Sequence, residues 1–470
     1  MAVSKELYIK MQNKVQPHLK SVYTRASRVL PESLIMSERY FEAKRYLELE
    51  DINDESSASI HSAQEVLLTR TLKNALENVP YYRDRVNLDP DKIVPSTAMD
   101  SLRLFPYIDK QEITSHPEEF ISDRFSKLSL IYTTSGGSTG QGVVLWKNRD
   151  EYQVEEAFIE DMWGRYGYER GARILRIAAD GIAPEDKPPC RRQDRRLLVS
   201  PRHLNDKWLD HIIDRSQEFR PEFIHTYPSC LEVVAAHLKA TGRTLNVKGI
   251  FLASEEVTSE QLDFFQEVFH VPICFFYGAS EHVLLGYGCY DGTRTTYHMN
   301  PLYGYAENRE DEYGFELVGT GLWNEAMPLI RYRTQDYGRI AELVKCPTCG
   351  RRVRTVERLD GRKQNYLITK QGTRFPGLSV WVDKFIWDYV STFQFVQNRP
   401  GAIELHICPR DNLTPEVEQR IIEAQRQKLS DWFDPITLVK VPRIDQTKGG
   451  KRRLVVVNIE GEVKNAPSTH

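Results

Sequence analysis

The feature that most constrains the fold is an alternation of short apolar segments with amphipathic stretches through the middle of the chain. The apolar segments have the length and composition of buried strands, and the stretches between them have helical periodicity. The predicted strands are 128–134, 172–178, 223–227, 249–253 and 271–277, and the predicted helices are 208–217, 230–238 and 260–268. Because strands that alternate with helices pair in parallel, we expect an α/β fold with a largely parallel sheet and helices on its faces.

The two ends of the chain follow other patterns. Before about residue 80 the apolar spacing is helical, and the clearest helix, 60–78, ends before Pro80. Beyond residue 362 a compact α+β unit of roughly 100 residues is expected, since its candidate strands and its one helix suit a small domain. Its predicted strands are 393–397, 402–408, 436–441 and 453–458, its helix begins at Thr414 and Pro415, and further strands are expected at 314–319 and 329–334.

One stretch in the first half, 183–206, is rich in proline and arginine. Three closely spaced prolines, at 184, 188 and 189, and five arginines after them predict an exposed loop with a solvated charged surface. A clamp for a phosphate or another acidic ligand is the alternative.

Composition excludes several classes of protein. Among 470 residues, 63 Lys and Arg nearly balance 66 Asp and Glu, so no dedicated nucleic-acid binder is indicated. Seven cysteines are too few for a disulfide framework, and we expect a reducing compartment, the cytoplasm. No stretch reaches the ~18 apolar residues that could span a bilayer. Residues 1–30 are basic and amphipathic, which predicts a helix packed on the body, with contact to an anionic membrane surface as the alternative.

Two segments carry residues suited to a nucleotide. The Gly/Ser/Thr-rich segment 133–142 follows a predicted strand, and its glycines would let backbone N–H groups approach a polyphosphate. A plain connecting turn is the alternative. Segment 275–281 ends a predicted strand, where open α/β sheets bind ligands, and its Glu281 carboxylate could hold Mg²⁺ on a nucleotide.

Three later segments add charged groups. In segment 328–336, Asp336 follows a predicted strand and is placed to accept hydrogen bonds from ribose hydroxyls. Segment 360–365 contains Arg362, and segment 448–451 ends in Lys451 after two glycines. A salt bridge would equally explain Asp336 and Arg362, and a solvated turn would explain Lys451.

In their order and spacing, these five segments resemble the core motifs of the adenylate-forming superfamily, which includes acyl-CoA synthetases, peptide-synthetase adenylation domains and luciferases. The resemblance is greatest to the phenylacetate-CoA ligase family and, within it, to the branch linked to capsule and surface-polysaccharide biosynthesis. It spans roughly residues 79–452, and segments 79–83, 227–229 and 253–255 also resemble that family's own segments.

The resemblance implies a large N-terminal adenylation domain with mixed sheets and flanking helices (1–361, including a helical region 1–80). A hinge at 362–364 and a small mobile C-terminal α+β domain (365–470) would complete it. The implied reaction joins ATP and a small carboxylic acid into an acyl-adenylate, releases pyrophosphate and transfers the acyl group to coenzyme A. Transfer to an amine or a sugar hydroxyl, and a nucleotide-binding scaffold without catalysis, are the alternatives.

The resemblance also implies roles for individual residues. Lys451 would act in catalysis on the reacting oxygens, Glu281 would ligate Mg²⁺, and Asp336 with Arg362 would hold the ribose. The remaining nucleotide-binding residues are the phosphate loop Ser135, Gly136, Gly137, Ser138, Thr139 and Gly140, and the adenine and acyl pocket residues Glu255, Tyr277, Gly278 and Ala279, with Ser280 beside them.

Three positions depart from the family pattern. Gln141 stands where the loop usually has Lys, Gln335 replaces the glycine of a Thr-Gly-Asp motif, and Gln364 replaces the usual Asp or Lys of the hinge. An inactive or repurposed member of the family therefore remains an alternative.

The cysteines indicate a separate site. Cys346 and Cys349 form a C-x₂-C knuckle, and Cys289 with His298 forms a C-x₈-H pair upstream. Three thiolates and one imidazole suit a tetrahedral structural Zn²⁺. A free or redox-active cysteine pair, and four unrelated residues, are the alternatives.

Overall fold

The computed structural model describes residues 32–134, 143–341, 343–357, 359–362 and 365–459. Its largest element is a ten-stranded sheet, in which β5, β3, β6, β7 and β8 run parallel and the outer strands are antiparallel. The order across this sheet is β14 (Ile340–Ala341), β15 (Thr355–Val356), β10 (Thr295–Met299), β9 (Leu285–Tyr290), β8 (Ile273–Gly278), β7 (Gly249–Leu252), β6 (Phe223–Thr226), β3 (Ile174–Ile177), β5 (Arg196–Val199) and β4 (Cys190–Gln193).

Helices before and between these strands pack on the sheet and on one another. In α8, Trp163 stacks on Phe251 of β7, with ring centroids 4.3 Å apart, so the end of this helix covers the middle of the sheet. The helices are α2 (Glu32–Ile35), α3 (Glu38–Leu47), α4 (Ala58–Asn78), α5 (Pro80–Arg85), α6 (Ala98–Leu102), α7 (Lys110–Ser115), α8 (Arg149–Gly164), α9 (Leu209–Phe219), α10 (Pro228–Thr241), α11 (Ser259–Phe269) and α12 (Pro415–Leu429).

Two four-stranded sheets complete the framework. The order in one is β11 (Gly304–Asp311), β12 (Gly314–Gly321), β13 (Tyr332–Tyr337) and β16 (Gly361–Arg362), and in the other β21 (Ile436–Lys440), β20 (Ile403–Pro409), β19 (Val390–Gln397) and β22 (Val455–Val457). The pairs β1 (Ile131–Thr134) with β2 (Val144–Lys147), and β17 (Tyr366–Ile368) with β18 (Arg374–Pro376), form two small sheets.

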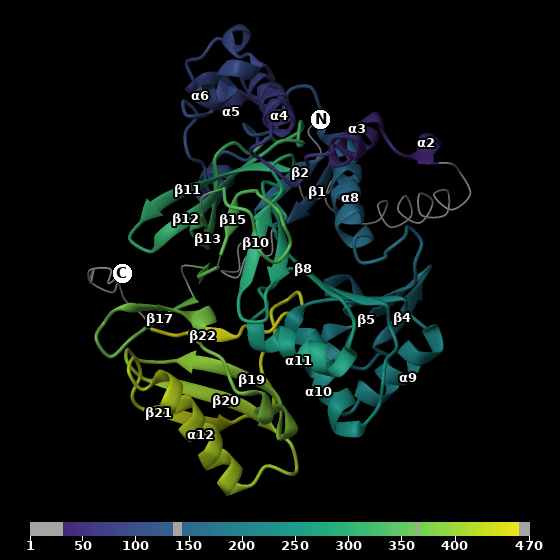
Figure 1. Ribbon diagram of the computed structural model, residues 1–470, viewed down its shortest axis with the longest axis vertical. Helices are drawn as coiled ribbons and strands as arrows, with labels where there is room; N and C mark the ends of the chain where they lie inside the picture. The colour runs from purple at the N-terminus through teal and green to yellow at the C-terminus, as the bar shows by residue number, and fades with distance from the viewer. Residues whose placement is uncertain (1–31, 135–142, 342, 358, 363–364, 460–470) are drawn as a thin grey trace, which may run out of the picture.

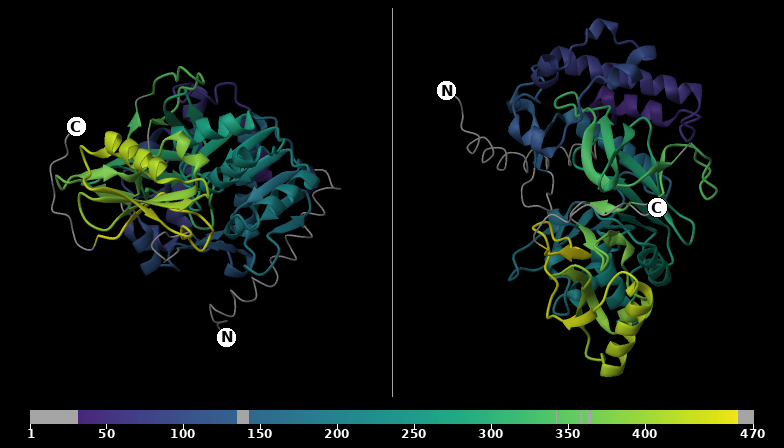
Figure 2. Two further views of the ribbon diagram at one scale, coloured as in Figure 1. Left: turned by 90° about the horizontal axis from the view of Figure 1, so that it is seen from below. Right: turned by 90° about the vertical axis from the view of Figure 1, so that its left-hand side faces the viewer.

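The C-terminal sheet and the helical N-terminal region lie at opposite ends of the molecule (Figures 1 and 2). At the C-terminal end, α12 begins as the sequence predicts: the Thr414 hydroxyl accepts from the Val417 N–H, and Pro415 occupies the first turn. The α/β fold class is confirmed. None of the described helices is long and apolar enough to cross a membrane.

The prediction of an exposed loop over 183–206 is right for the five arginines, which are exposed, and wrong in that the segment also contains strands. The segment contains the hairpin β4–β5, and Leu197, Leu198 and Val199 of β5 are buried in the large sheet beside β3. The arginines make the segment look like a solvated loop in the sequence. Most of them lie on the exposed edge strand β4 and in the turn that follows it, beside the short buried strand β5. A charged edge strand also protects the sheet against pairing with another chain.

Candidate functional site

Two adjoining cavities lie where the parallel strands of the large sheet end. The first has a volume of about 910 Å³ and the second about 380 Å³. Both are lined by Ser254, Phe276, Gly278, Arg362 and Lys451, so these residues mark the junction between them. Ligands of open α/β sheets bind at this edge, beyond the carboxyl ends of the strands.

A fixed carboxylate projects into the first cavity. Asp336 of β13 is 9% exposed, and it accepts hydrogen bonds from Arg362 Nε (2.9 Å) and from the Tyr277 hydroxyl (3.0 Å). The antiparallel register of β13 and β16 sets Asp336 directly opposite Arg362. The Asp336 carboxylate raises the pKa of the Arg362 guanidinium, and burial followed by that carboxylate raises the pKa of Tyr277. The salt bridge considered from the sequence is present, and it lines a cavity.

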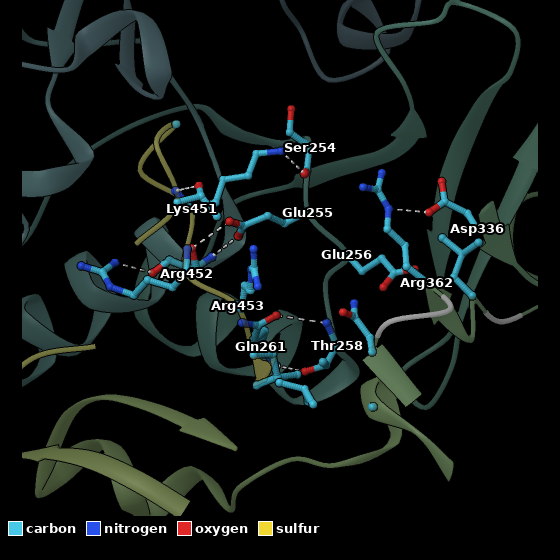
Figure 3. A pocket seen from close by; sticks show the side chains of 18 of the residues that line it. Ser254, Glu255, Glu256, Thr258, Gln261, Asp336, Arg362, Lys451, Arg452 and Arg453 are labelled. Carbon is cyan, nitrogen blue, oxygen red and sulfur yellow. Dashed lines mark hydrogen bonds and ion pairs between the residues drawn. The ribbon is translucent and has the colours of Figure 1, made fainter. Parts of the chain in front are cut away.

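Lys451 reaches the junction from the C-terminal part of the chain (Figure 3). Its Nζ donates to the backbone carbonyl of Ser254 (2.6 Å), and Ser254 has a left-handed φ of 69°. A tight turn positions the Lys451 backbone, since the Thr447 N–H donates to the Lys451 carbonyl (2.9 Å) and Gly450 has a φ of 81°. Burial lowers the pKa of Lys451, and the Glu255 carboxylate counteracts part of that shift. Lys451 is therefore a partly desolvated cation held at the meeting point of both cavities.

Glu255 lies beside Lys451 in the first cavity. Its two carboxylate oxygens accept from the Ser229 hydroxyl (3.1 Å) and the Ser229 N–H (3.0 Å). Burial raises the pKa of Glu255. A single serine at the start of α10 thus fixes the orientation of this carboxylate.

Glu281 and the residues before it line the second cavity. The Glu281 carboxylate accepts from the Tyr332 hydroxyl (3.1 Å) and lines this cavity together with Ala279 and Ser280. Its oxygen ligand would suit Mg²⁺. The structure therefore brings Lys451, Glu255, Asp336, Arg362 and the run from Tyr277 to Glu281 around one pair of cavities.

Some predicted residues lie outside the described residues. These are Ser135, Gly136, Gly137, Ser138, Thr139 and Gly140 of the phosphate loop, Gln141, the hinge residue Gln364 and residues 1–30. Thr134, the last residue of β1, lines the first cavity, so the described chain leads into this loop from the cavity wall.

Sequence reasoning missed part of the lining. Glu256, Gln261 and Arg452 line the first cavity, and burial raises the pKa of Glu256 to about 8. Arg176 and His225 line the second cavity from the middle of strands β3 and β6. A charged or polar residue inside an otherwise apolar strand is the sequence signal that could have identified this last pair.

The predicted Cys and His residues form one cluster. One possible ligand atom from each of Cys289, His298, Cys346 and Cys349 lies within 4.8 Å of every other. The antiparallel pairing of β9 with β10 sets Cys289 opposite Thr296, so His298, two residues on, faces the same side. The His298 Nδ1 contacts the Thr355 hydroxyl (3.0 Å), which leaves Nε2 facing the Cys349 Sγ at 3.3 Å.

Known proteins show the same fold. No protein-family model matches the chain. Protein CapK of Staphylococcus aureus is 21% identical over 96% of this chain and all of its own length. The phenylacetate-coenzyme A ligase of Escherichia coli K12 is 27% identical over 76% of this chain and 83% of its own. A crystal structure of 2-hydroxyisobutyryl-CoA ligase with 2-HIB-AMP, in the postadenylation state, superposes with a TM-score of 0.66 at 13% identity, covering 86% of this chain and 91% of that one.

The chain therefore has the fold of the adenylate-forming CoA ligases. Its sequence relatives are the phenylacetate-coenzyme A ligases and CapK. The resemblance inferred from the sequence motifs is thereby confirmed.

Proposed function

We propose that this protein activates a small carboxylic acid with ATP as an acyl-adenylate and then transfers the acyl group to coenzyme A. The observation that carries the proposal is the paired cavity, in which the Asp336–Arg362–Tyr277 network and Lys451 converge. ATP fits the first cavity and the acid fits the second, because Lys451 at their junction can reach the bond that joins the two substrates.

The roles of the residues follow from their places. Asp336, fixed by Arg362, accepts hydrogen bonds from the ribose hydroxyls. The phosphate loop Ser135 to Gly140 lies outside the described residues, and its role, to cradle the β- and γ-phosphates, is proposed from the motif resemblance alone. Glu255, Tyr277, Gly278, Ala279 and Ser280 line the adenine and acyl subsites, of which Glu255, Tyr277 and Gly278 lie in the first cavity.

In the first half-reaction, a carboxylate oxygen of the acid attacks the α-phosphorus of ATP. The bond from the α-phosphorus to the bridging oxygen breaks, and pyrophosphate leaves with its electron pair. Negative charge grows on the phosphoryl and bridging oxygens, and Lys451 stabilises that charge in a partly desolvated site. Glu281 offers an oxygen ligand for Mg²⁺, which would neutralise phosphate charge when bound.

In the second half-reaction, the thiolate of coenzyme A attacks the acyl carbon and AMP leaves. Lys451 belongs to the C-terminal part, which we propose is a mobile domain (365–470) hinged at 362–364 around Gln364, so rotation would withdraw it after adenylation. Polar contacts hold the Lys451 turn on the large sheet's side, as in the donation from Arg202 Nη2 to the Lys448 carbonyl (3.1 Å). An apolar contact adds to them elsewhere, since Trp387 of the C-terminal part stacks on Phe264 of α11 with ring centroids 5.5 Å apart.

Acid-dependent release of pyrophosphate from ATP, followed by mass spectrometry of the product formed with coenzyme A, tests the proposal. Nucleotide binding with no acid-dependent turnover across a carboxylate panel would contradict it and favour the scaffold alternative. An amine or a sugar hydroxyl is the alternative acceptor class. Product formation with these acceptors in place of coenzyme A would favour it.

We also propose that Cys289, His298, Cys346 and Cys349 hold one structural Zn²⁺. Four protein ligands leave no position for an activated water, and the hydrogen bond that His298 Nδ1–H donates to the Thr355 hydroxyl fixes the imidazole orientation, as second-shell groups do at zinc sites. Zinc-binding cysteines must stay reduced, and the cytoplasm is a reducing compartment, so we continue to expect that the protein is located there.

A further inference from the structure

The second cavity carries two polar side chains in the middle of the parallel sheet. Arg176 is the third residue of β3 and His225 the third of β6, and the strand register sets them side by side. Their neighbours along the strands, including Leu175 and Ile224, are fully buried. Central parallel strands are normally continuous apolar runs, and positions that break such a local rule tend to be functional.

The Arg176 guanidinium has a donor nitrogen, Nη2, that its contacts with Asp180 and His225 do not use. Its Nε donates to both oxygens of Asp180 (2.9 and 2.8 Å), and its Nη1 lies 2.6 Å from His225 Nδ1 and 3.3 Å from Nε2. Within the described residues, Nη2 makes no hydrogen bond. A guanidinium has no acceptor, so the nearer His225 nitrogen, Nδ1, accepts. Burial, followed by the Arg176 charge, lowers the pKa of His225 well below its usual value, so the imidazole is neutral and able to accept.

Aromatic packing holds this pair in place. Trp163 meets the His225 ring edge to face, with centroids 4.8 Å apart, and stacks on Phe251 in the next strand. Arg176 and His225 line the second cavity only, whereas Lys451 lines both. The pair therefore lines the cavity that we assign to the acid.

We propose that the acid activated by this protein carries an oxygen-bearing polar group beyond its reacting carboxylate, and that Arg176 binds this group. His225 is a positioning residue, because it holds the guanidinium through Nη1. The inference rests on the proposed function. An unsubstituted hydrocarbon end would leave Arg176 Nη2 without a ligand partner, and sites built for a hydroxyl discriminate strongly against analogues that lack it.

Linear acids of four to eight carbons provide the test. At each length, the far end is a methyl, a hydroxyl or a carboxylate, and phenylacetate serves as an aromatic reference. Kcat/KM is measured from pyrophosphate release. We expect the best hydroxyl or carboxylate acid to exceed its methyl partner by about 10- to 100-fold. The hydroxyl and carboxylate arms show whether the bound group is neutral or anionic.

Substitutions link the preference to the residues. Arg176→Met should bring the polar-to-methyl ratio close to 1, and Arg192→Met, an exposed arginine of β4 that lines neither cavity, should leave it unchanged. His225→Leu should lower the ratio through a higher KM for the polar acid, and His225→Gln, which keeps an acceptor, should partly restore it. Thermal unfolding of each variant verifies folding.

The outcomes separate the two proposals. Preference for the methyl acids or for phenylacetate, or a ratio that folded Arg176→Met leaves intact, overturns the inference while the proposed function stands. Absence of turnover with every acid contradicts the proposed function and overturns the inference with it.

Discussion

Replacing Lys451 by Met removes the charge at the junction of the cavities and keeps an aliphatic stem over the Tyr227 ring, whose centroid lies 5.2 Å from Nζ. The lysine is partly buried, so an effective dielectric of about 20 applies, and a unit charge about 4 Å from the developing negative charge contributes about 4 kcal/mol. That energy corresponds to about a 10³-fold loss in the rate of acyl-adenylate formation. Transfer from supplied acyl-adenylate to coenzyme A should change little, since the domain rotation that we propose would withdraw Lys451 before that step.

The assay measures the two half-reactions separately. Single-turnover pyrophosphate release reports adenylation, and thioester formation from chemically prepared acyl-adenylate reports transfer. Lys440→Met is the matched control, because Lys440 ends β21 in the same C-terminal part, is exposed and lines neither cavity. We expect the control to retain both rates within about 3-fold, as exposed charges contribute little. Equal losses in both half-reactions of Lys451→Met would refute the assignment of Lys451 to adenylation.

Three further predictions concern the nucleotide, the protonation of the first cavity and the metal. Asp336→Asn should weaken ATP binding by about 1 to 3 kcal/mol, measured by calorimetry, without changing the preference among acids, and unaltered affinity in a folded variant would count against the ribose role. Burial raises the pKa of Glu256 to about 8, so the folded state binds more protons than the unfolded state between roughly pH 4.5 and 8, and the free energy of unfolding should fall as pH rises through that window. Urea unfolding should show a weaker fall for Glu256→Gln, and parallel pH profiles would contradict this. Purified protein should contain about one zinc, lost in Cys289→Ser and Cys346→Ser and retained in Cys190→Ser, with chelation lowering the melting temperature; metal-free protein of full stability would exclude the site.

The sequence predicts best where one periodicity dominates. The strands β6 and β7 and the helix α4 fall within a few residues of their expected positions, because their apolar patterns are uninterrupted. Prediction fails at β5, because three buried apolar residues that directly follow two arginines are too few to show a periodic pattern. The predicted strand 128–134 also begins late, because residues 127–129 form a single 3₁₀ turn before β1.

The candidate site was predictable where a motif keeps its order, and less so where tertiary contacts choose the residues. Asp336 and Arg362 were found from their motifs, but their pairing across β13 and β16 depends on strand register. The cluster around Cys346 could be predicted from sequence spacing. The two cysteines of C-x₂-C lie in one turn, and the cysteine and histidine of C-x₈-H lie on the two paired strands of one hairpin. Arg176 and His225 were missed because 49 positions separate them, and only the sheet brings them together.

Gln335 shows how the fold can preserve a site when a motif changes. It replaces the expected turn glycine and has a φ of 62°, a left-handed conformation that costs a residue with a side chain about 1 to 2 kcal/mol. The Gln335 N–H donates to the Glu316 carboxylate (3.1 Å), which is fully buried and also accepts from Arg333 Nε (2.8 Å). These contacts hold the turn in the conformation that glycine would adopt freely, so the next residue, Asp336, still lines the first cavity. The loss of this glycine therefore does not by itself argue for loss of nucleotide binding.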